Sequence, residues 1–245
     1  MRIALISDLH GNLPALRALE QDLTRMLPDE IWCLGDLVGK GPSSDITCDW
    51  VFEHCSLILG GNWDFGIARR EYLRDAFYHE QLGQARMDKL ALLPTEHCLL
   101  LSGRRIRLIH GRPVMQKLLH IQDSKESLLP FLAPDYDMLI YADCHRQGVR
   151  TIEGQVINIG SVGNGLGLPL VQYAFLEGEP GQGMAGLDIR LVTLPYNNQA
   201  AAQDARQAHE LPDAHAYIHE VLTGEYAGRM RVKSEKRMNE GDNYV

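Results

Sequence analysis

The sequence predicts an α/β or α+β fold class, and three observations along its 245 residues support this prediction. The first third alternates short apolar runs with amphipathic helical patterns, the part after Pro94 is rich in strand patterns, and the chain returns to helical spacing from residue 197. Short helical crossovers between successive strands imply a parallel sheet with helices on its faces. Hydrophobic residues make up 45% of the chain, which allows a sizeable core and excludes wholesale disorder.

The first third is expected to run strand, helix, strand, helix, strand. Strands are predicted at Arg2–Ser7, Ile31–Leu34 and Ser56–Leu59, because each is a short apolar run followed by polar residues or glycine. Leucines at helical spacing from residue 13 to 27 predict the first helix, and residues 45–55 suit a second.

The remaining chain combines helical ends with a strand-rich middle. Residues 64–93 and 197–222 are predicted to be mostly helical. No repeat or low-complexity linker divides the chain, so we expect one domain over residues 1–223 and a polar, partly basic tail over 224–245. Between the helical ends we expect a helix at Ser124–Leu132, strands at Cys98–Ser102, Arg105–Ile109, Met138–Ala142, Val149–Ile152 and Val156–Ile159, and a hairpin of Val171–Leu176 with Leu187–Leu194.

Charge and cysteine content narrow the class of protein. Twenty-four basic residues against 32 acidic ones give a net charge of −8, which disfavours a binder of duplex nucleic acid. No apolar run reaches the ~20 residues that span a bilayer, and the first is too short for a signal peptide. The five cysteines form no Cys-x-x-Cys pair, which favours free thiols in a reducing compartment. We therefore expect a soluble cytoplasmic protein, whose oligomeric state the sequence leaves open.

Acidic residues, histidines and an asparagine follow five of the predicted strands. In an open parallel sheet the carboxyl ends of the strands form the ligand crevice, so side chains after separate strands meet at one edge. A single Asp-x-His is weak evidence, because it is more often a cap or a surface pair, but five clusters at five strand ends are hard to explain as caps. We therefore predict a metal site formed by Asp8, His10, Asp36, Asn62, His110, Asp143 and His145.

The composition of this set narrows the choice of metal. Three carboxylates, three imidazoles and one amide suit Mn²⁺, Fe²⁺, Co²⁺, Ni²⁺ or Zn²⁺ better than Ca²⁺ or a structural zinc site. Seven ligands exceed what one tetrahedral ion takes, whereas two ions that share a carboxylate use them all. Such ions, about 3.5–4 Å apart, would activate a shared water and hold a phosphoryl oxygen. We expect Cys144, between two proposed ligands, to be a small buried thiol rather than a ligand.

Short motifs at these positions resemble those of the calcineurin-like metallophosphoesterases. Their order and spacing match along the chain as far as residues 158–163, a turn similar to the Asn-Pro-Gly-Ser-Val-Gly turn of the small prokaryotic branch of this family. The matching motifs are Asp8-Leu9-His10-Gly11-Asn12, Gly35-Asp36-Leu37-Val38-Gly39, Gly61-Asn62-Trp63-Asp64 and His110-Gly111.

The resemblance implies a fold, a reaction and a ligand assignment. The fold would be a four-layer α/β/β/α sandwich with two mixed sheets. The reaction would be in-line attack of a metal-bridging hydroxide on a phosphate ester, with Asp36, Asn62 and His145 as catalytic residues. Asp8, His10, Asp36 and His145 would bind the first ion, Asp36 would bridge, and Asn62, His110 and Asp143 would complete the second site.

Two positions depart from the family pattern. Trp63 stands where the family usually has a histidine that stabilises the transition state or protonates the leaving group, and general acid catalysis is worth about 10²–10⁴-fold. Trp63 either packs in the protein or stacks on a nucleobase or aryl group. Asp143 replaces the first histidine of the family's Gly-His-Thr-His. A carboxylate there favours Mn²⁺ or Fe²⁺ at the second site, and the alternative is an impaired second site.

Two further positions bear on the substrate. Lys40 lies in a loop similar to that of the small prokaryotic branch. The protein Ser/Thr phosphatases have an arginine there, in a different Asp-Arg-Gly context, so a phosphoprotein is disfavoured as the substrate. Arg112 either contacts a substrate phosphate, together with Asn62 and Trp63, or forms a structural ion pair. We expect a dinuclear metal-dependent phosphoesterase that hydrolyses a small phosphodiester or nucleotide-type ester. The alternative is a catalytically weak metal- or phosphate-binding protein with a regulatory role.

Overall fold

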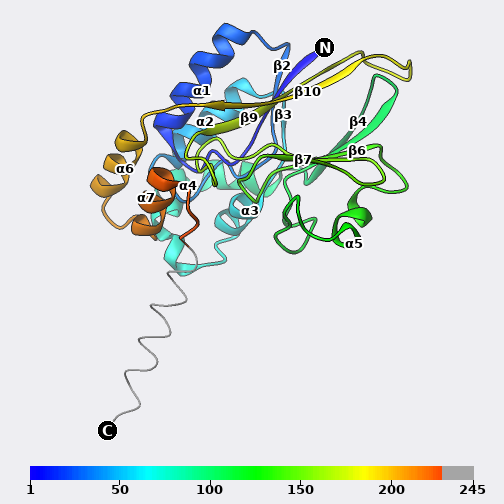
Figure 1. Ribbon diagram of the computed structural model, residues 1–245. Helices are drawn as coiled ribbons and strands as arrows, with labels where there is room; N and C mark the ends of the chain where they lie inside the picture. Colours follow the sequence, from blue (N-terminus) through cyan, green and yellow to red (C-terminus); the bar gives the residue numbers. More distant parts are fainter. Residues whose placement is uncertain (228–245) are drawn as a thin grey trace.

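Residues 1–227, the part of the chain that the computed structural model describes, form two five-stranded β-sheets stacked face to face (Figure 1). Both sheets mix parallel and antiparallel neighbours. The first has the order β10 (Leu187–Leu194), β9 (Val171–Gly178), β1 (Arg2–Ile6), β2 (Glu30–Cys33) and β3 (Leu57–Ile58). The second has the order β4 (Glu96–Leu101), β5 (Arg104–Ile109), β6 (Met138–Tyr141), β8 (Gln155–Asn158) and β7 (Gly148–Thr151).

Helices cover the outer face of each sheet. The second sheet is covered by the one-turn helix α5 (Lys125–Leu128), the 3-10 turn η2 (Leu129–Phe131) and neighbouring loops. A short 3-10 turn, η1 (Leu73–Asp75), links two helices on the other side. The helices beside the first sheet are α1 (Leu13–Met26), α2 (Ser44–His54), α3 (Asn62–Ala68), α4 (Ala76–Ala91), α6 (Asn198–Gln207) and α7 (Ala214–Thr223) (Figure 1).

Side-chain alternation along the strands explains the four layers. On β1, Ile6 packs against the helices and Leu5 faces the second sheet. On β6, Ile140 faces the first sheet and Leu139 packs on the outer side near α5. Both faces of the central strands are therefore buried, which is why these strands read as continuous apolar runs. The predicted four-layer α/β/β/α sandwich with two mixed sheets is confirmed.

Residues 64–93 and 197–222 are mostly helical, as predicted, but both are interrupted, and the third predicted helix is shorter than expected. Residues 197–222 form two helices, because Ala208 is extended and Pro212, which lacks an N–H, lies between them. Residues 64–93 are interrupted between α3 and α4, where Arg70 has a positive φ of 55° and Tyr72 is extended. The segment Ser124–Leu132 contains only one α-helical turn, because Pro130 lacks the N–H that would continue it.

The single domain over residues 1–223 stays a prediction. Of the predicted tail, residues 224–227 are described and residues 228–245 lie outside the described part. None of the helices within residues 1–227 has both the length and the apolar character needed to cross a bilayer.

A turn after β8 holds the two sheets together beside the crevice. The N–H of Val162 donates to the carbonyl of Ser7 at 2.9 Å, and the N–H of Gly163 donates to that of Asp8 at 2.8 Å. The hydroxyl of Ser161 donates to the same Asp8 carbonyl at 2.9 Å. The loop after β1 of the first sheet is thus fixed by a turn that follows β8 of the second.

Gly163 has no room for a side chain, because a Cβ atom there would overlap the carbonyl oxygen of Leu9. We predict that Gly163→Ala lowers the free energy of unfolding by about 1–3 kcal/mol, since the added carbon pushes the turn away from the β1 loop. Urea unfolding measures this. Gly183→Ala is the matched control, because nothing lies within 4 Å of a Cβ at that position. Equal stability of the two variants would contradict the prediction.

Candidate metal centre

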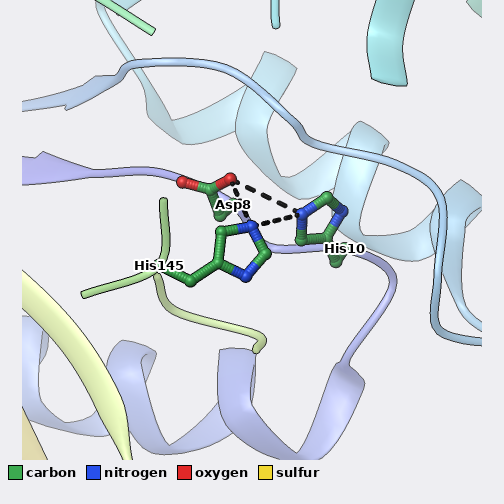
Figure 2. A group of neighbouring side chains, drawn as sticks. All are labelled: Asp8, His10 and His145. Carbon is green, nitrogen blue, oxygen red and sulfur yellow. Dashed lines mark hydrogen bonds and ion pairs between the residues drawn. The ribbon is translucent and has the colours of Figure 1, made fainter. Parts of the chain in front are cut away.

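Strand ends from both sheets bring the predicted ligands to one edge of the sandwich. Asp8 and His10 follow β1, Asp36 follows β2, and His110 follows β5. His145 follows β6, with Asp143 on the same turn, and Asn62 begins α3 after β3. Two groups of buried side chains have ligand atoms within 4.8 Å of one another, namely Asp8, His10 and His145 (Figure 2) and Asp8, Asp36 and His110.

The backbone bends sharply at the proposed ligands. Asp8, His10, Asp36, Asp143 and His145 all have positive φ values, between 48° and 65°. Non-glycine residues in this region cost of order 1–3 kcal/mol each, and they cluster at functional sites when the surrounding structure holds them. Here the surrounding hydrogen bonds include that from the Asp8 N–H to the Gly35 carbonyl at 2.8 Å.

All three histidines are oriented by a backbone carbonyl. A carbonyl oxygen only accepts, so each Nδ1 carries the proton of its hydrogen bond and each Nε2 faces the carboxylates. Nε2 is therefore the atom available to a cation. The acceptors are the carbonyls of Val38 for His10 at 3.1 Å, Leu34 for His110 at 2.9 Å and Asn164 for His145 at 2.9 Å.

The inward-facing atoms lack partners of their own. Among residues 1–227, Asp8 Oδ1, His110 Nε2 and Asn62 Oδ1 are buried without a hydrogen bond. His145 Nε2 lies 3.2 Å from His10 Nε2 and 3.1 Å from Asp8 Oδ1 (Figure 2). Two nitrogen lone pairs this close to each other and to a carboxylate require positive charge between them. Carboxylate, imidazole and amide donors suit divalent transition metals, so these residues fit a metal site.

Burial and neighbouring charges shift the pKa values within the cluster. Burial alone would raise the pKa of Asp8, but the imidazoles of His145 and His110 outweigh it and hold that pKa well below its usual range. Burial lowers the pKa of His10. At His110 the effect of burial is outweighed by Asp36 and Asp8, which raise its pKa well above the usual value. Burial would also raise the pKa of Asp36, but His110 outweighs it and holds that pKa below its usual value, so Asp8 and Asp36 are both ionised.

Asp143 lies beside the second group and pairs with Arg112. Arg112 donates from Nη2 to Oδ1 at 2.6 Å and from Nε to Oδ2 at 2.9 Å, and its backbone N–H donates to Oδ2 at 3.0 Å. His110 Nε2 is 3.9 Å from Asp143 Oδ1. Of the two roles expected for Arg112, the structure contains the ion pair.

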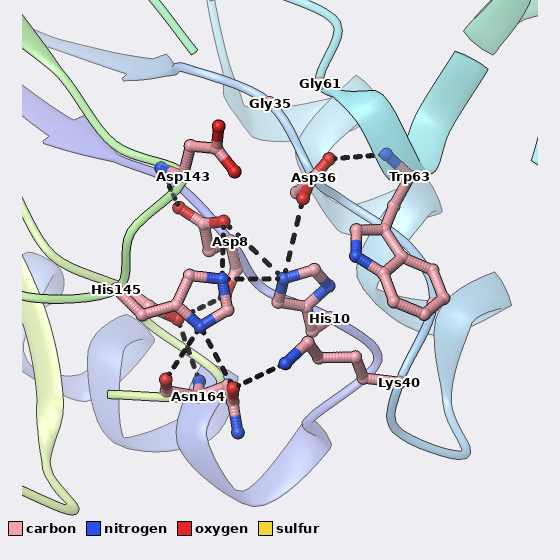
Figure 3. Close-up of polar contacts among 12 residues, drawn as sticks. Asp8, His10, Gly35, Asp36, Lys40, Gly61, Trp63, Asp143, His145 and Asn164 are labelled. Carbon is pink, nitrogen blue, oxygen red and sulfur yellow. Dashed lines mark hydrogen bonds and ion pairs between the residues drawn. The ribbon is translucent and has the colours of Figure 1, made fainter. Parts of the chain in front are cut away.

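Trp63 packs within the site. Its ring covers Gly39, where a Cβ atom would overlap the indole, and lies edge-on to His10 with 5.8 Å between ring centroids. Its backbone N–H donates to Asp36 Oδ1 at 2.9 Å (Figure 3). Trp63 therefore positions Asp36 through its main chain, whatever its ring contacts in a complex.

Asp64 supports the site, although sequence reasoning gave it no role. Its carboxylate accepts the backbone N–H groups of Asp36 at 2.7 Å, Leu37 at 2.9 Å and Gly61 at 2.9 Å. It therefore ties the loop after β2 to the start of α3. An acidic residue in the first turn of a helix is the sequence signal for such a cap.

A cavity of about 1050 Å³ opens from the cluster. It reaches from Asp36 and Trp63 past Arg112 to Tyr226, beyond the end of α7. A cavity of this size accommodates a ligand larger than a phosphate ion.

Comparisons with known proteins assign the family. Residues 1–179 match the calcineurin-like phosphoesterase superfamily domain, so the chain belongs to this superfamily, and the predicted resemblance is confirmed. Its members are phosphoesterases that typically bind divalent metals, and the chain carries two candidate metal-binding groups.

The chain is also similar to individual proteins and solved structures. The chain is 26% identical over 172 residues to an uncharacterised protein of Methanocaldococcus jannaschii, covering 63% of this chain and 67% of that protein. A metallophosphoesterase from Sphaerobacter thermophilus has 24% identity and a TM-score of 0.71 over 91% of this chain and 99% of its own. A hypothetical protein from Pyrococcus horikoshii has 18% identity and a TM-score of 0.75, over 92% and 99% respectively. These two structures establish the fold.

Cys144 is expected to react slowly with alkylating reagents. Burial raises its pKa to about 12, and its Sγ faces the Arg146 carbonyl at 3.7 Å. Since only a thiolate reacts or binds metal, we predict that iodoacetamide at pH 8 modifies exposed Cys98 long before Cys144. Peptide mass spectrometry measures the two rates, and labelling in urea is the control for reagent excess. Equal rates in the folded protein would contradict the prediction.

Proposed function

We propose that this protein is a cytoplasmic, dinuclear metal-dependent phosphodiesterase that hydrolyses a small phosphodiester or nucleotide-type ester. The main support is the convergence of buried imidazole Nε2 atoms and carboxylate oxygens in two groups, in which Asp8 Oδ1 and His110 Nε2 have no hydrogen-bond partner among residues 1–227. Each of the five cysteines, all within that range, is a free thiol, which supports a reducing compartment.

The ligand assignment follows the two halves of the cluster. Asp36 is the proposed bridge, because its Oδ2 lies 3.3 Å from His110 Nε2 and 3.6 Å from His10 Nε2. Asp8, His10 and His145 would complete one site. Asn62, His110 and Asp143 would complete the other, and the three carboxylates of the whole set favour Mn²⁺ or Fe²⁺ over Zn²⁺, Co²⁺ or Ni²⁺.

The chemistry that two bound ions supply is polarisation of a phosphoryl oxygen and activation of water. The chain contributes the positions of the reacting groups. Asp36, Asn62 and His145 are the proposed catalytic residues, and Asn62, Trp63 and Arg112 the proposed contacts to substrate. Position 63 offers no imidazole to protonate a leaving group, so esters with good leaving groups are the favoured substrates.

A second candidate function rests on the Asp143–Arg112 pair. Arg112 engages both oxygens of Asp143. If that pair persists, the second site lacks a ligand and the protein binds metal or phosphate with little turnover, in a regulatory role. Turnover of an activated diester separates the two functions.

The deciding experiment measures metal content and hydrolysis together. Wild-type protein loaded with Mn²⁺ is expected to bind two ions and to cleave bis(p-nitrophenyl) phosphate faster than p-nitrophenyl phosphate. Asp36→Asn is predicted to weaken both sites and to lower kcat/KM by about 10²-fold or more, since loss of an ion removes several kcal/mol of charge stabilisation. The control is Asp49→Asn on α2, whose carboxylate pairs with Arg86. Full activity of the Asp36 variant would overturn the dinuclear proposal, and an inactive wild type with bound metal would favour the second function.

Asp143 gives a separate test of the second site. We predict that Asp143→Ala weakens binding of the second ion and leaves the first, because Asp8, His10 and His145 are unchanged. Titration calorimetry with Mn²⁺ resolves the two sites, and Asp143→His is the control that restores an imidazole ligand. Two unaltered affinities in the alanine variant would show that Asp143 serves only as the partner of Arg112.

A further inference from the structure

A chain of buried polar contacts leads from helix α7 to the proposed ligand His145. Glu220 on α7 accepts from Lys40 Nζ at 3.0 Å, and Lys40 also donates to Asn164 Oδ1 at 2.9 Å. His145 Nδ1 lies 2.9 Å from the same oxygen and 2.9 Å from the Asn164 carbonyl (Figure 3). The side chains of Lys40 and Glu220 are 16% and 5% exposed, so water does little to screen their pair.

Lys40 determines which way the Asn164 amide faces. An ammonium group only donates, so the atom it contacts must be the amide oxygen. That oxygen and the Asn164 backbone carbonyl both accept from His145 Nδ1, and together they keep the proton on Nδ1 and leave Nε2 directed at Asp8 and His10. A flipped amide would set an NH₂ group against the Nδ1 proton.

Glu220 in turn holds Lys40 in place. The lysine sits at a strained turn with φ of 57°, and its long side chain has many rotamers to lose. Glu220 compensates its charge and is itself held by the N–H of Ala227, which donates to the other carboxylate oxygen at 3.2 Å. Removing the glutamate charge leaves a half-buried ammonium without its counter-ion.

Glu220 and Lys40 lie on opposite sides of the end of the matched family domain. Glu220 lies beyond residues 1–179, which match the family domain. Lys40 lies within that domain, in the loop between β2 and α2. Each residue is the other's ionic partner, so the pair links α7 to the loop after β2.

We propose that Glu220 and Lys40 are positioning residues that fix the Asn164 amide, which with the Asn164 backbone carbonyl holds the tautomer and direction of His145 as a metal ligand. The inference rests on the proposed metal site. The helix α7 thus tunes the first ion from outside the family domain. Partners in this outer layer change metal affinity by about 10–100-fold when removed.

The test compares metal affinity and the state of His145. Glu220→Gln keeps the shape and the acceptor for Ala227 but loses the charge, and Lys40→Met removes the donor. Each is expected to raise the Kd of the first Mn²⁺ by about 10–100-fold in calorimetry. Lys40→Arg is expected to retain most of the affinity. In ¹⁵N-labelled metal-free protein, the imidazole spectrum of His145 should change from one Nδ1–H form to a mixture in the glutamine and methionine variants.

A matched control separates positioning from stability. Asp22→Asn also removes a buried carboxylate from an ion pair, with its side chain 6% exposed beside Arg25 on α1. It is expected to lower the melting temperature without changing the Kd or the His145 spectrum. If folded Lys40→Met and Glu220→Gln variants have the wild-type Kd and the wild-type His145 spectrum, the proposal is overturned. The ion pair then serves only to hold α7 in place. If wild type binds no metal, the proposed function fails, while the metal-free spectra still decide the orientation of His145.

Discussion

The burial of two carboxylates, Asp8 and Asp36, at the junction of two sheets is the constraint on which the rest of the site depends. Both are ionised and almost wholly removed from water, a state that costs several kcal/mol per charge unless positive charge compensates it. Three histidines surround these carboxylates, and the Nδ1 atom of each already donates to a backbone carbonyl. Two candidate metal-binding groups therefore combine buried negative charge with side chains that are already oriented.

This arrangement of side chains requires a strained backbone conformation. Five proposed ligands occupy the left-handed region, and the loops that carry them are held by hydrogen bonds from a turn of the opposite sheet and from Asp64. Such loops are stable only inside the complete sandwich, because the isolated strands provide none of these partners. Fold and site are consequently interdependent.

Much of the fold and of the cluster was predictable from local sequence. Buried strands such as β1 and β6 appear as short apolar runs, and the ligands follow them directly, so their meeting at one edge is a consequence of parallel pairing. Contacts between residues far apart in the sequence cannot be recognised from local sequence patterns. The Asp143–Arg112 pair spans 31 residues and the Lys40–Glu220 pair spans 180, and no periodicity encodes either. The only sequence signal for the split between α6 and α7 is Pro212, and one proline within a long helical pattern does not show where the helix ends.

The ligands come from both sheets, with Asp8, His10 and Asp36 on loops of the first and His110 and His145 on loops of the second. Under the proposed function, an ion shared among them would act as a cross-link between the two halves of the sandwich. Sliding or separation of the sheets would then require release of the ion, so metal occupancy would govern how readily the molecule opens along its central interface. Hydrogen exchange at the N–H groups of Val162 and Gly163, which bridge the sheets at this edge, reports that opening directly.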